Sequence, residues 1–180
     1  MFCLLLLSLF GPTNGSFDYN GRATLDDLYS FFVSTGKIYL YKRSYSRLIS
    51  GNEPQCIVNE RAFLNSTNLS LVQRYSYGGR GVYYFVSATL SAAELSDHAP
   101  IIEATGPRGK RRNYFFQYYD AEGRCAVITF SDNTCSIKCE LHIWEEKVKD
   151  GPSENCEREY KFLCRKQKAN RVFNDKECMR

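Results

Sequence analysis

"CAVITFSDNTCSIKCELHIWEEKV", residues 125–148, contains two apolar runs of strand length joined by a polar turn. Side chains of a strand alternate between its two faces. In the second run, Ile137, Cys139, Leu141 and Ile143 share one face, and Lys138, Glu140, His142 and Trp144 share the other. A face that combines a carboxylate, an imidazole and an indole on a half-buried strand indicates a wall that looks into a cavity.

The same period of two recurs through the middle of the chain and predicts eight strands. They are expected at 37–45, 55–63, 69–77, 82–90, 99–105, 113–119, 125–130 and 137–144. The connections "YGGRG", "GPRGK", "DAEG" and "SDNT" are rich in turn-forming residues. We therefore expect an all-β fold, an eight-stranded antiparallel up-and-down β-barrel, with room for one small ligand.

Helices are expected at both ends of this barrel sequence. Thr24 is a good N-cap, and acidic residues occupy the first turn after it. The helix that starts there should continue to about Phe32. Asp150-Gly151-Pro152 predicts the start of a second helix, with Pro152 at its first position. Its apolar stripe contains Cys156, Tyr160, Leu163 and Cys164. This helix should pack on the outside of the barrel and precede an extended tail that ends at Cys178.

The N-terminal residues have the character of a secretory signal. Residues 1–10 carry no charged side chain and include four consecutive leucines, and Thr13 and Gly15 have the spacing of a cleavage site. We predict a signal peptide over 1–15 and a single secreted domain over 16–180. No later stretch is long and apolar enough to insert into a membrane. The net charge of +4 does not indicate nucleic-acid binding.

Seven cysteines lie outside the predicted signal, enough for three disulfides and one odd thiol. Counting alone leaves the pairing open. If the second helix packs outside the barrel, Cys139 must face outward to meet it. The pairs expected on that basis are Cys56–Cys178, Cys125–Cys156 and Cys139–Cys164. Cys135, at a hairpin tip, is left without an obvious partner.

The same orientation points the alternate residues of the last two strands into the barrel. The expected ligand-binding residues are Glu140, His142, Trp144, Ala126, Ile128, Phe130, Phe116, Tyr114 and Tyr118. Three alternatives stay open. Glu140 could instead pair with a buried cation or lie near an open end, His142 could be a hydrogen-bonded interior residue, and Trp144 could plug the barrel.

The order of these features resembles that of the salivary lipocalins of ticks, which include the histamine-binding proteins and the sterol-binding japanins. The resemblance covers nearly the whole mature chain. It is carried by Tyr118-Tyr119-Asp120, Cys125, Cys139-Glu140-Leu141, Cys156, Cys164 and Cys178, and more weakly by "IYLYKRSY" before Cys56. It implies a secreted lipocalin barrel without enzymatic activity or cofactor, which modulates host immune or inflammatory responses.

Two departures from the amine-binding members matter for the ligand. Those members show Cys-Asp on the seventh strand and Glu-Leu-Trp on the eighth, whereas this chain has Cys125-Ala126 and Glu140-Leu141-His142. A buried ammonium needs a fixed negative partner. We therefore rank a sterol such as cholesterol, or a lipid mediator, above histamine or another biogenic amine. In a different class of function, the barrel is a scaffold whose loops bind a host immune-cell protein. The protein itself could be a monomer or a dimer.

Three remaining patterns carry smaller predictions. The sequons Asn65-Ser66-Thr67 and Asn68-Leu69-Ser70 predict glycosylation at Asn65 and Asn68. The basic run "GPRGKRR", 106–112, is a solvated hairpin tip or a site for an acidic partner. With two histidines and no nucleophile motif, neither a metal site nor catalysis is expected.

Overall fold

The structure, a computed structural model, describes residues 22–93, 98–131, 136–165 and 167–179. The predicted signal peptide and Cys135 lie outside these residues. None of the helices in the described part of the chain is long and apolar enough to cross a bilayer.

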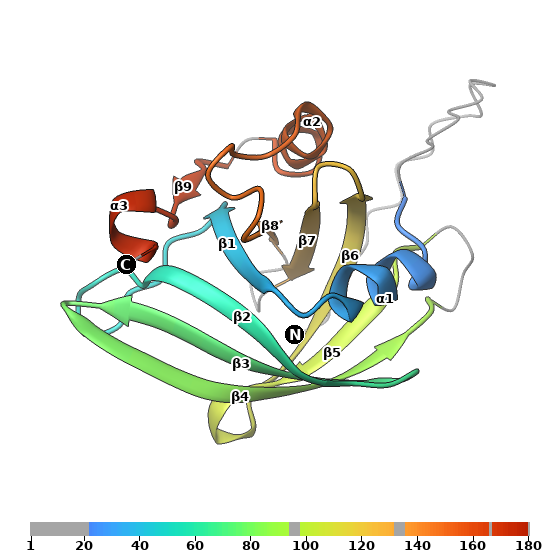
Figure 1. Ribbon diagram of the computed structural model, residues 1–180, viewed down its shortest axis with the longest axis horizontal. Coiled ribbons are helices and arrows are strands. Elements are labelled where there is room, and N and C mark those ends of the chain that lie inside the picture. The colour runs from blue at the N-terminus through green and yellow to red at the C-terminus, as the bar shows by residue number, and fades with distance from the viewer. Residues whose placement is uncertain (1–21, 94–97, 132–135, 166, 180) are drawn as a thin grey trace.

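Eight antiparallel strands form a closed barrel, as predicted (Figure 1). The strands are β1 (Lys37–Arg43), β2 (Gln55–Leu64), β3 (Asn68–Tyr77), β4 (Arg80–Ser91), β5 (Ile101–Thr105), β6 (Arg111–Asp120), β7 (Cys125–Ser131) and β8 (Ile137–Trp144). Each strand pairs with the next, and β1 closes the barrel by pairing with both β8 and β2. A short strand, β9 (Asn170–Arg171), pairs antiparallel with the end of β1, at Lys42 and Arg43.

The alternation predicted for β7 and β8 is confirmed. Cys139, Leu141 and Ile143 belong to a buried outer cluster together with residues of the C-terminal helix. Glu140 and His142 face the interior of the barrel. The register between the two strands is regular along their whole length, so each keeps one face inside and one outside.

One end of the barrel is closed by the N-terminal helix α1 (Leu25–Val33). Thr24 and Asp27 form a capping box that starts this helix. Leu28, Phe31 and Phe32 are buried in the inner core, and the Phe31 ring lies 5.9 Å from that of Trp144, measured between centroids. Because α1 fills this end, the cavity described below opens toward the opposite end.

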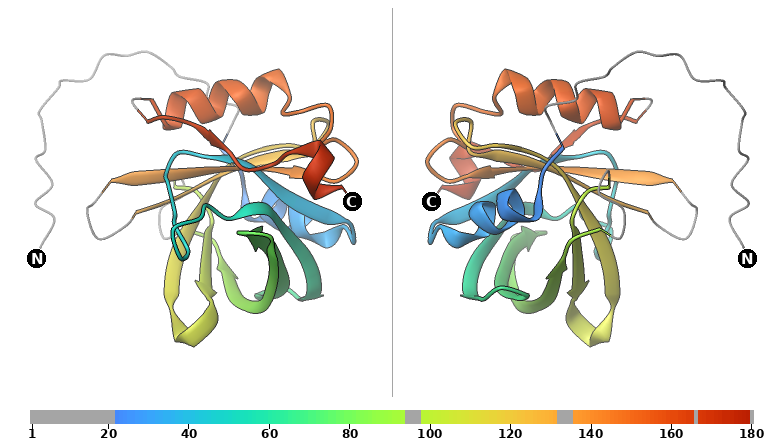
Figure 2. Two further views of the ribbon diagram at one scale, coloured as in Figure 1. Left: turned by 90° about the vertical axis from the view of Figure 1, so that its left-hand side faces the viewer. Right: turned by 90° about the vertical axis from the view of Figure 1, so that its right-hand side faces the viewer.

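The C-terminal helix α2 (Glu154–Leu163) packs on the outside of the barrel over β6, β7 and β8 (Figure 2). It starts later than predicted. Ser153 is the N-cap and accepts a hydrogen bond from the Cys156 backbone amide, so Pro152 precedes the helix. The serine hydroxyl satisfies a free amide of the first turn, which proline at this position could not do.

Three disulfides attach this C-terminal segment to the barrel: Cys56–Cys178, Cys125–Cys156 and Cys139–Cys164. These are the pairs expected from the strand orientation. The tail is not extended to its end, because a short helix, α3 (Asp175–Cys178), presents Cys178 to β2. Asn174 caps this helix by accepting a hydrogen bond from the Lys176 amide.

Candidate functional site: the barrel cavity

The barrel encloses a cavity of about 870 Å³, within the range of pockets that hold small molecules. All eight barrel strands contribute to its wall. Phe32 of α1 forms part of the floor, and the loops after β1 and between β5 and β6 surround the open end. Its apolar lining is Phe32, Ile38, Ile49, Leu71, Val86, Ala88, Ile102, Ala104, Pro107, Ile128 and Phe130.

A hydrogen-bonded cluster of Tyr45, Glu140 and His142 interrupts the apolar wall. The Tyr45 hydroxyl donates to Glu140 Oε1, and His142 Nε2 donates to Oε2 over 3.0 Å. Burial raises the pKa of the Glu140 carboxyl, but the hydrogen bond and charge of His142 and the hydrogen bond of Tyr45 outweigh it, so this pKa lies below its usual value. Glu140 is therefore a carboxylate whose two oxygens are both already engaged.

Arg112 lies above this cluster, packed against aromatic rings. Its guanidinium carbon is 4.2 Å from the Phe130 ring centroid, and its Nη1 is 3.5 Å from the Tyr114 hydroxyl. Burial and the negative charge of Glu140 raise the pKa of Tyr114 to about 12, so its hydroxyl stays protonated at neutral pH. Arg112 and Tyr114 thus direct N–H and O–H groups toward the cavity.

Positive charge collects at the open end of the cavity. Five basic residues, here termed the basic mouth, line it: Arg47, Arg108, Lys110, Arg112 and Lys138. Among the described lining residues, Glu140 alone is acidic. Arg108 and Lys110 come from the turn that contains the 3-10 helix η1 (Pro107–Gly109). The basic run at 106–112 is therefore part of the cavity wall, not only a solvated hairpin tip.

Five of the nine residues predicted to bind ligand line the cavity. They are Tyr114, Ile128, Phe130, Glu140 and His142. Phe116, Ala126 and Trp144 also face inward but pack in the core beneath α1, outside the cavity lining. For Trp144 this is the plugging role that the sequence left open.

Tyr118 is a correction to the predicted lining. A bulge between Phe116 and Tyr118 shifts the register against β7. The inward position then passes to Tyr119, which packs on the inner core, while Tyr118 joins the outer cluster. An added residue in one strand reverses the faces of everything after it, and periodicity in the sequence does not reveal this.

A second polar group, not predicted from the sequence, lies in the cavity wall. Gln73 Nε2 donates to Asn59 Oδ1 over 2.8 Å, and the Tyr84 hydroxyl donates to Gln73 Oε1. Alternation could have found Gln73 and Tyr75, because they share a strand face with the inward Leu69 and Leu71. Tyr45 lies just after β1, where strand parity no longer applies.

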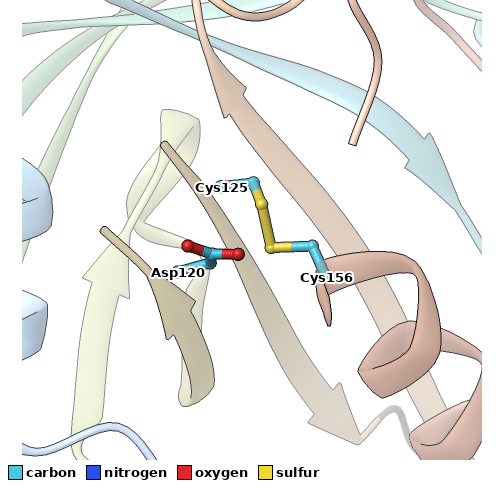
Figure 3. A group of neighbouring side chains, drawn as sticks. All are labelled: Asp120, Cys125 and Cys156. Atoms are coloured by element: carbon cyan, nitrogen blue, oxygen red, sulfur yellow. A yellow bond between two sulfur atoms is a disulfide. The ribbon is translucent and has the colours of Figure 1, made fainter. Parts of the chain in front are cut away.

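One group of potential metal ligands lies outside the barrel: Asp120, Cys125 and Cys156 (Figure 3). The two sulfur atoms are joined in a disulfide, which leaves no thiolate to bind a metal.

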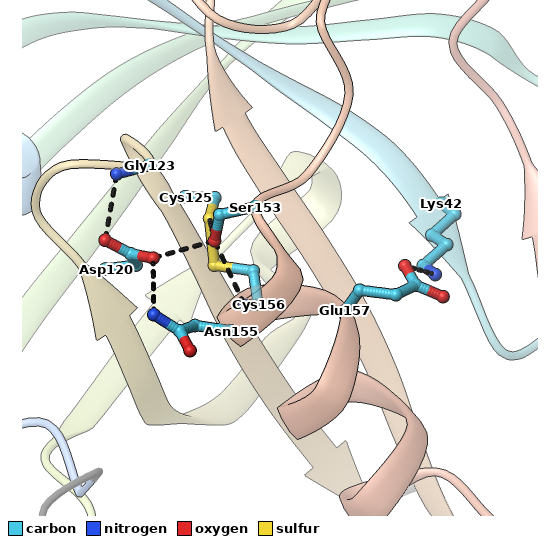
Figure 4. Close-up of a disulfide and its surroundings, with 8 residues drawn as sticks. All are labelled: Lys42, Asp120, Gly123, Cys125, Ser153, Asn155, Cys156 and Glu157. Carbon is cyan, nitrogen blue, oxygen red and sulfur yellow. Dashed lines mark hydrogen bonds and ion pairs between the residues drawn. A yellow bond between two sulfur atoms is a disulfide. The ribbon is translucent and has the colours of Figure 1, made fainter.

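Asp120 instead connects the β6–β7 turn to α2 (Figure 4). It accepts hydrogen bonds from the Gly123 amide at 2.8 Å, the Ser153 hydroxyl at 2.7 Å and Asn155 Nδ2 at 3.4 Å. Burial raises the pKa of Asp120, but these hydrogen bonds outweigh it and the pKa falls below its usual value.

Known proteins that are similar to this chain identify its family. No curated protein sequence matches the chain. Among solved structures, the AM182–serotonin complex matches with a TM-score of 0.58 and 14% identity, covering 78% of this chain and 83% of that one. Japanin from Rhipicephalus appendiculatus, bound to cholesterol, matches with a TM-score of 0.55 and 14% identity, covering 78% and 95%. These similarities concern the fold alone. The family model described as tick histamine binding protein matches residues 23–180, and the chain therefore belongs to the tick histamine-binding protein family of lipocalins.

Proposed function

We propose that this protein binds one small amphipathic lipid in its barrel, with the apolar body inside and an acidic head group at the basic mouth. The observation that carries the proposal is the position of Arg47, Arg108, Lys110, Arg112 and Lys138 around the opening of a largely apolar cavity. Such a ligand belongs to the lipid-mediator class. As a member of a family of binding proteins, the chain would act by sequestering this ligand.

The energetics of the cavity favour a ligand of this kind. Burying about 300 Å² of apolar ligand surface would contribute about 7.5 kcal/mol. Association costs several kcal/mol of translational and rotational freedom. A charge-assisted hydrogen bond between a carboxylate and an arginine adds about 1.5–3 kcal/mol. The apolar wall would thus provide most of the affinity, and the basic mouth would select for an acidic head group.

A biogenic amine is a weaker candidate for the same cavity. The carboxylate that could pair with an ammonium, Glu140, already accepts hydrogen bonds from Tyr45 and His142. An entering cation would also pass five positive charges. A sterol, the ligand in the japanin structure, is the second candidate, because Tyr114 or the Tyr45–Glu140 pair could hydrogen-bond a single hydroxyl.

Secretion and action in a host belong to the same proposal. The predicted signal peptide and three disulfides support an extracellular protein. A tick protein that removes a lipid mediator at the feeding site would dampen host inflammation. A scaffold that engages a host immune-cell protein is the alternative, and in that case the barrel would bind no lipid tightly.

The test is a ligand panel measured on the secreted protein. Competitive displacement of a fluorescent fatty acid would compare a twenty-carbon fatty acid, its alcohol, cholesterol, serotonin and histamine at fixed ionic strength. We expect the acid to bind at least tenfold more tightly than the alcohol, and this preference to shrink with added salt. Tighter binding of either amine, or equal binding of acid and alcohol, would refute the proposed head-group preference.

A further inference from the structure

The hairpin between β2 and β3 lies at the closed end of the barrel and carries two consecutive sequons, at 65–67 and 68–70. Its turn is closed by a hydrogen bond from the Asn65 amide to the Asn68 carbonyl, over 2.9 Å. Leu64 packs against the inner core near α1. On β2, Phe63 points to the outer face beside the inward Leu64, and Asn65, the first residue of the turn, is exposed.

Phe63 is an unusual residue for that outer position. It is 52% exposed, although a phenylalanine normally stabilises a protein by leaving water. A bulge between Arg61 and Phe63 sets this orientation, and it pairs Phe63 with Ser70 on β3. The exposed ring therefore lies two residues before Asn65 in the chain, with an open side available for contact.

The two sequon asparagines differ in what their side chains do. Asn65 Oδ1 accepts hydrogen bonds from the backbone amides of Thr67 at 3.0 Å and Asn68 at 2.7 Å, which fixes its amide plane. Within the described part of the chain, Asn65 Nδ2 donates no hydrogen bond. Asn68 Nδ2, in contrast, donates to Thr67 Oγ1 at 3.0 Å. Asn68 Nδ2 also donates to Asn65 Oδ1 at 3.4 Å. A substituent on Asn65 Nδ2 would leave these bonds of the turn intact, whereas one on Asn68 Nδ2 would leave a single N–H for its two bonds.

We propose that Asn65 carries an N-linked glycan whose first sugar packs on the Phe63 ring and stabilises the β2–β3 hairpin. In the secretory pathway, Asn65 Nδ2 would attack the anomeric carbon of a lipid-diphosphate-linked oligosaccharide. The new C–N bond replaces the sugar–phosphate C–O bond, the amide loses one proton, and the lipid diphosphate leaves. The apolar C–H face of the sugar then covers an aromatic face that the protein leaves in water.

Glycan occupancy is measured on protein secreted from insect cells. Enzymatic release of the glycan in ¹⁸O water converts a glycosylated asparagine to labelled aspartate, and peptide fragmentation locates the label. The expected result is a label at Asn65. A label at Asn68 alone, or at neither residue, would overturn the proposal.

The packing on Phe63 is tested by thermal unfolding in an Asn68→Gln background, which leaves one sequon. Each variant is compared as glycosylated secreted protein and as unglycosylated protein refolded from bacteria. We expect the glycan to raise Tm by about 2–4 °C, and Phe63→Ala to remove most of this gain. Phe85→Ala is the matched control, since Phe85 is 65% exposed on β4 and too far to touch the sugar. Equal gains in all variants, or a gain lost in both alanine variants, would overturn the proposal.

Discussion

Replacement of Arg112 by glutamine is the most direct probe of the basic mouth. Arg112 is half-buried, whereas Arg47, Arg108 and Lys110 are exposed to solvent. Its guanidinium lies against the Phe130 ring, where screening by water is reduced. A hydrogen bond to a charged group contributes about 1.5–3 kcal/mol. Arg112→Gln should therefore weaken binding of a fatty acid about 10- to 150-fold.

The matched control is Lys110→Gln, which removes the same charge from an exposed position. Exposed ion pairs contribute about 0.2–1 kcal/mol, so the loss should stay below about fivefold. Calorimetric titration of each variant with a twenty-carbon acid and with its alcohol separates the effect of charge on affinity from the effect of packing. Arg112→Gln should leave binding of the alcohol nearly unchanged. If acid and alcohol lose affinity equally, or the acid loses none, the assignment of Arg112 as head-group contact is wrong.

Three further predictions concern stability. The pKa of Glu140 is lowered from 4.5, so its carboxylate stabilises the fold above about pH 4.5, and this stabilisation is lost as the pH falls further. In urea unfolding, the free energy of unfolding of Glu140→Gln should therefore decrease less steeply at acid pH than that of the unmodified protein. Identical pH profiles of the two proteins would contradict this prediction. Replacing both Cys56 and Cys178, 122 residues apart, by serine should cost about 3–5 kcal/mol by calorimetry, and an unchanged Tm would argue against this disulfide. In Gly36→Ala the new methyl would lie 3.1 Å from Trp144 Cζ3. This close contact should lower the free energy of unfolding by about 1–3 kcal/mol and alter the fluorescence emission of the single tryptophan. Unchanged emission and stability would disprove the contact.

The sequence predicted the barrel, and where the strands are regular it also predicted which side chains face inward. Along β8, Cys139 faces α2 and Glu140 faces the cavity, because no bulge interrupts its pairing with β7. Along β6 the same reasoning held through Tyr114 and Phe116 but was wrong at Tyr118, after the bulge. A bulge depends on how two strands meet, so one strand's own residues do not determine it.

The basic mouth could not be predicted for a different reason. The basic run at 106–112 was visible in the sequence, and its place in a turn was correct. Whether that turn lies at the open or the closed end depends on where α1 packs. This helix buries Phe31 and Phe32 against residues that are distant in sequence, including Trp144. Only the assembled barrel shows that the charges surround the entrance.

The division of β8 into two faces has an evolutionary consequence. Its outward positions 139, 141 and 143 are held by α2 and a disulfide, and changes there would disturb the framework. Its inward positions 140 and 142 line the cavity and hydrogen-bond to each other and to Tyr45, so a mutation there can alter ligand choice while the outer framework stays in place. A lineage that duplicates such a gene can diversify its targets by point changes on one side of a single strand.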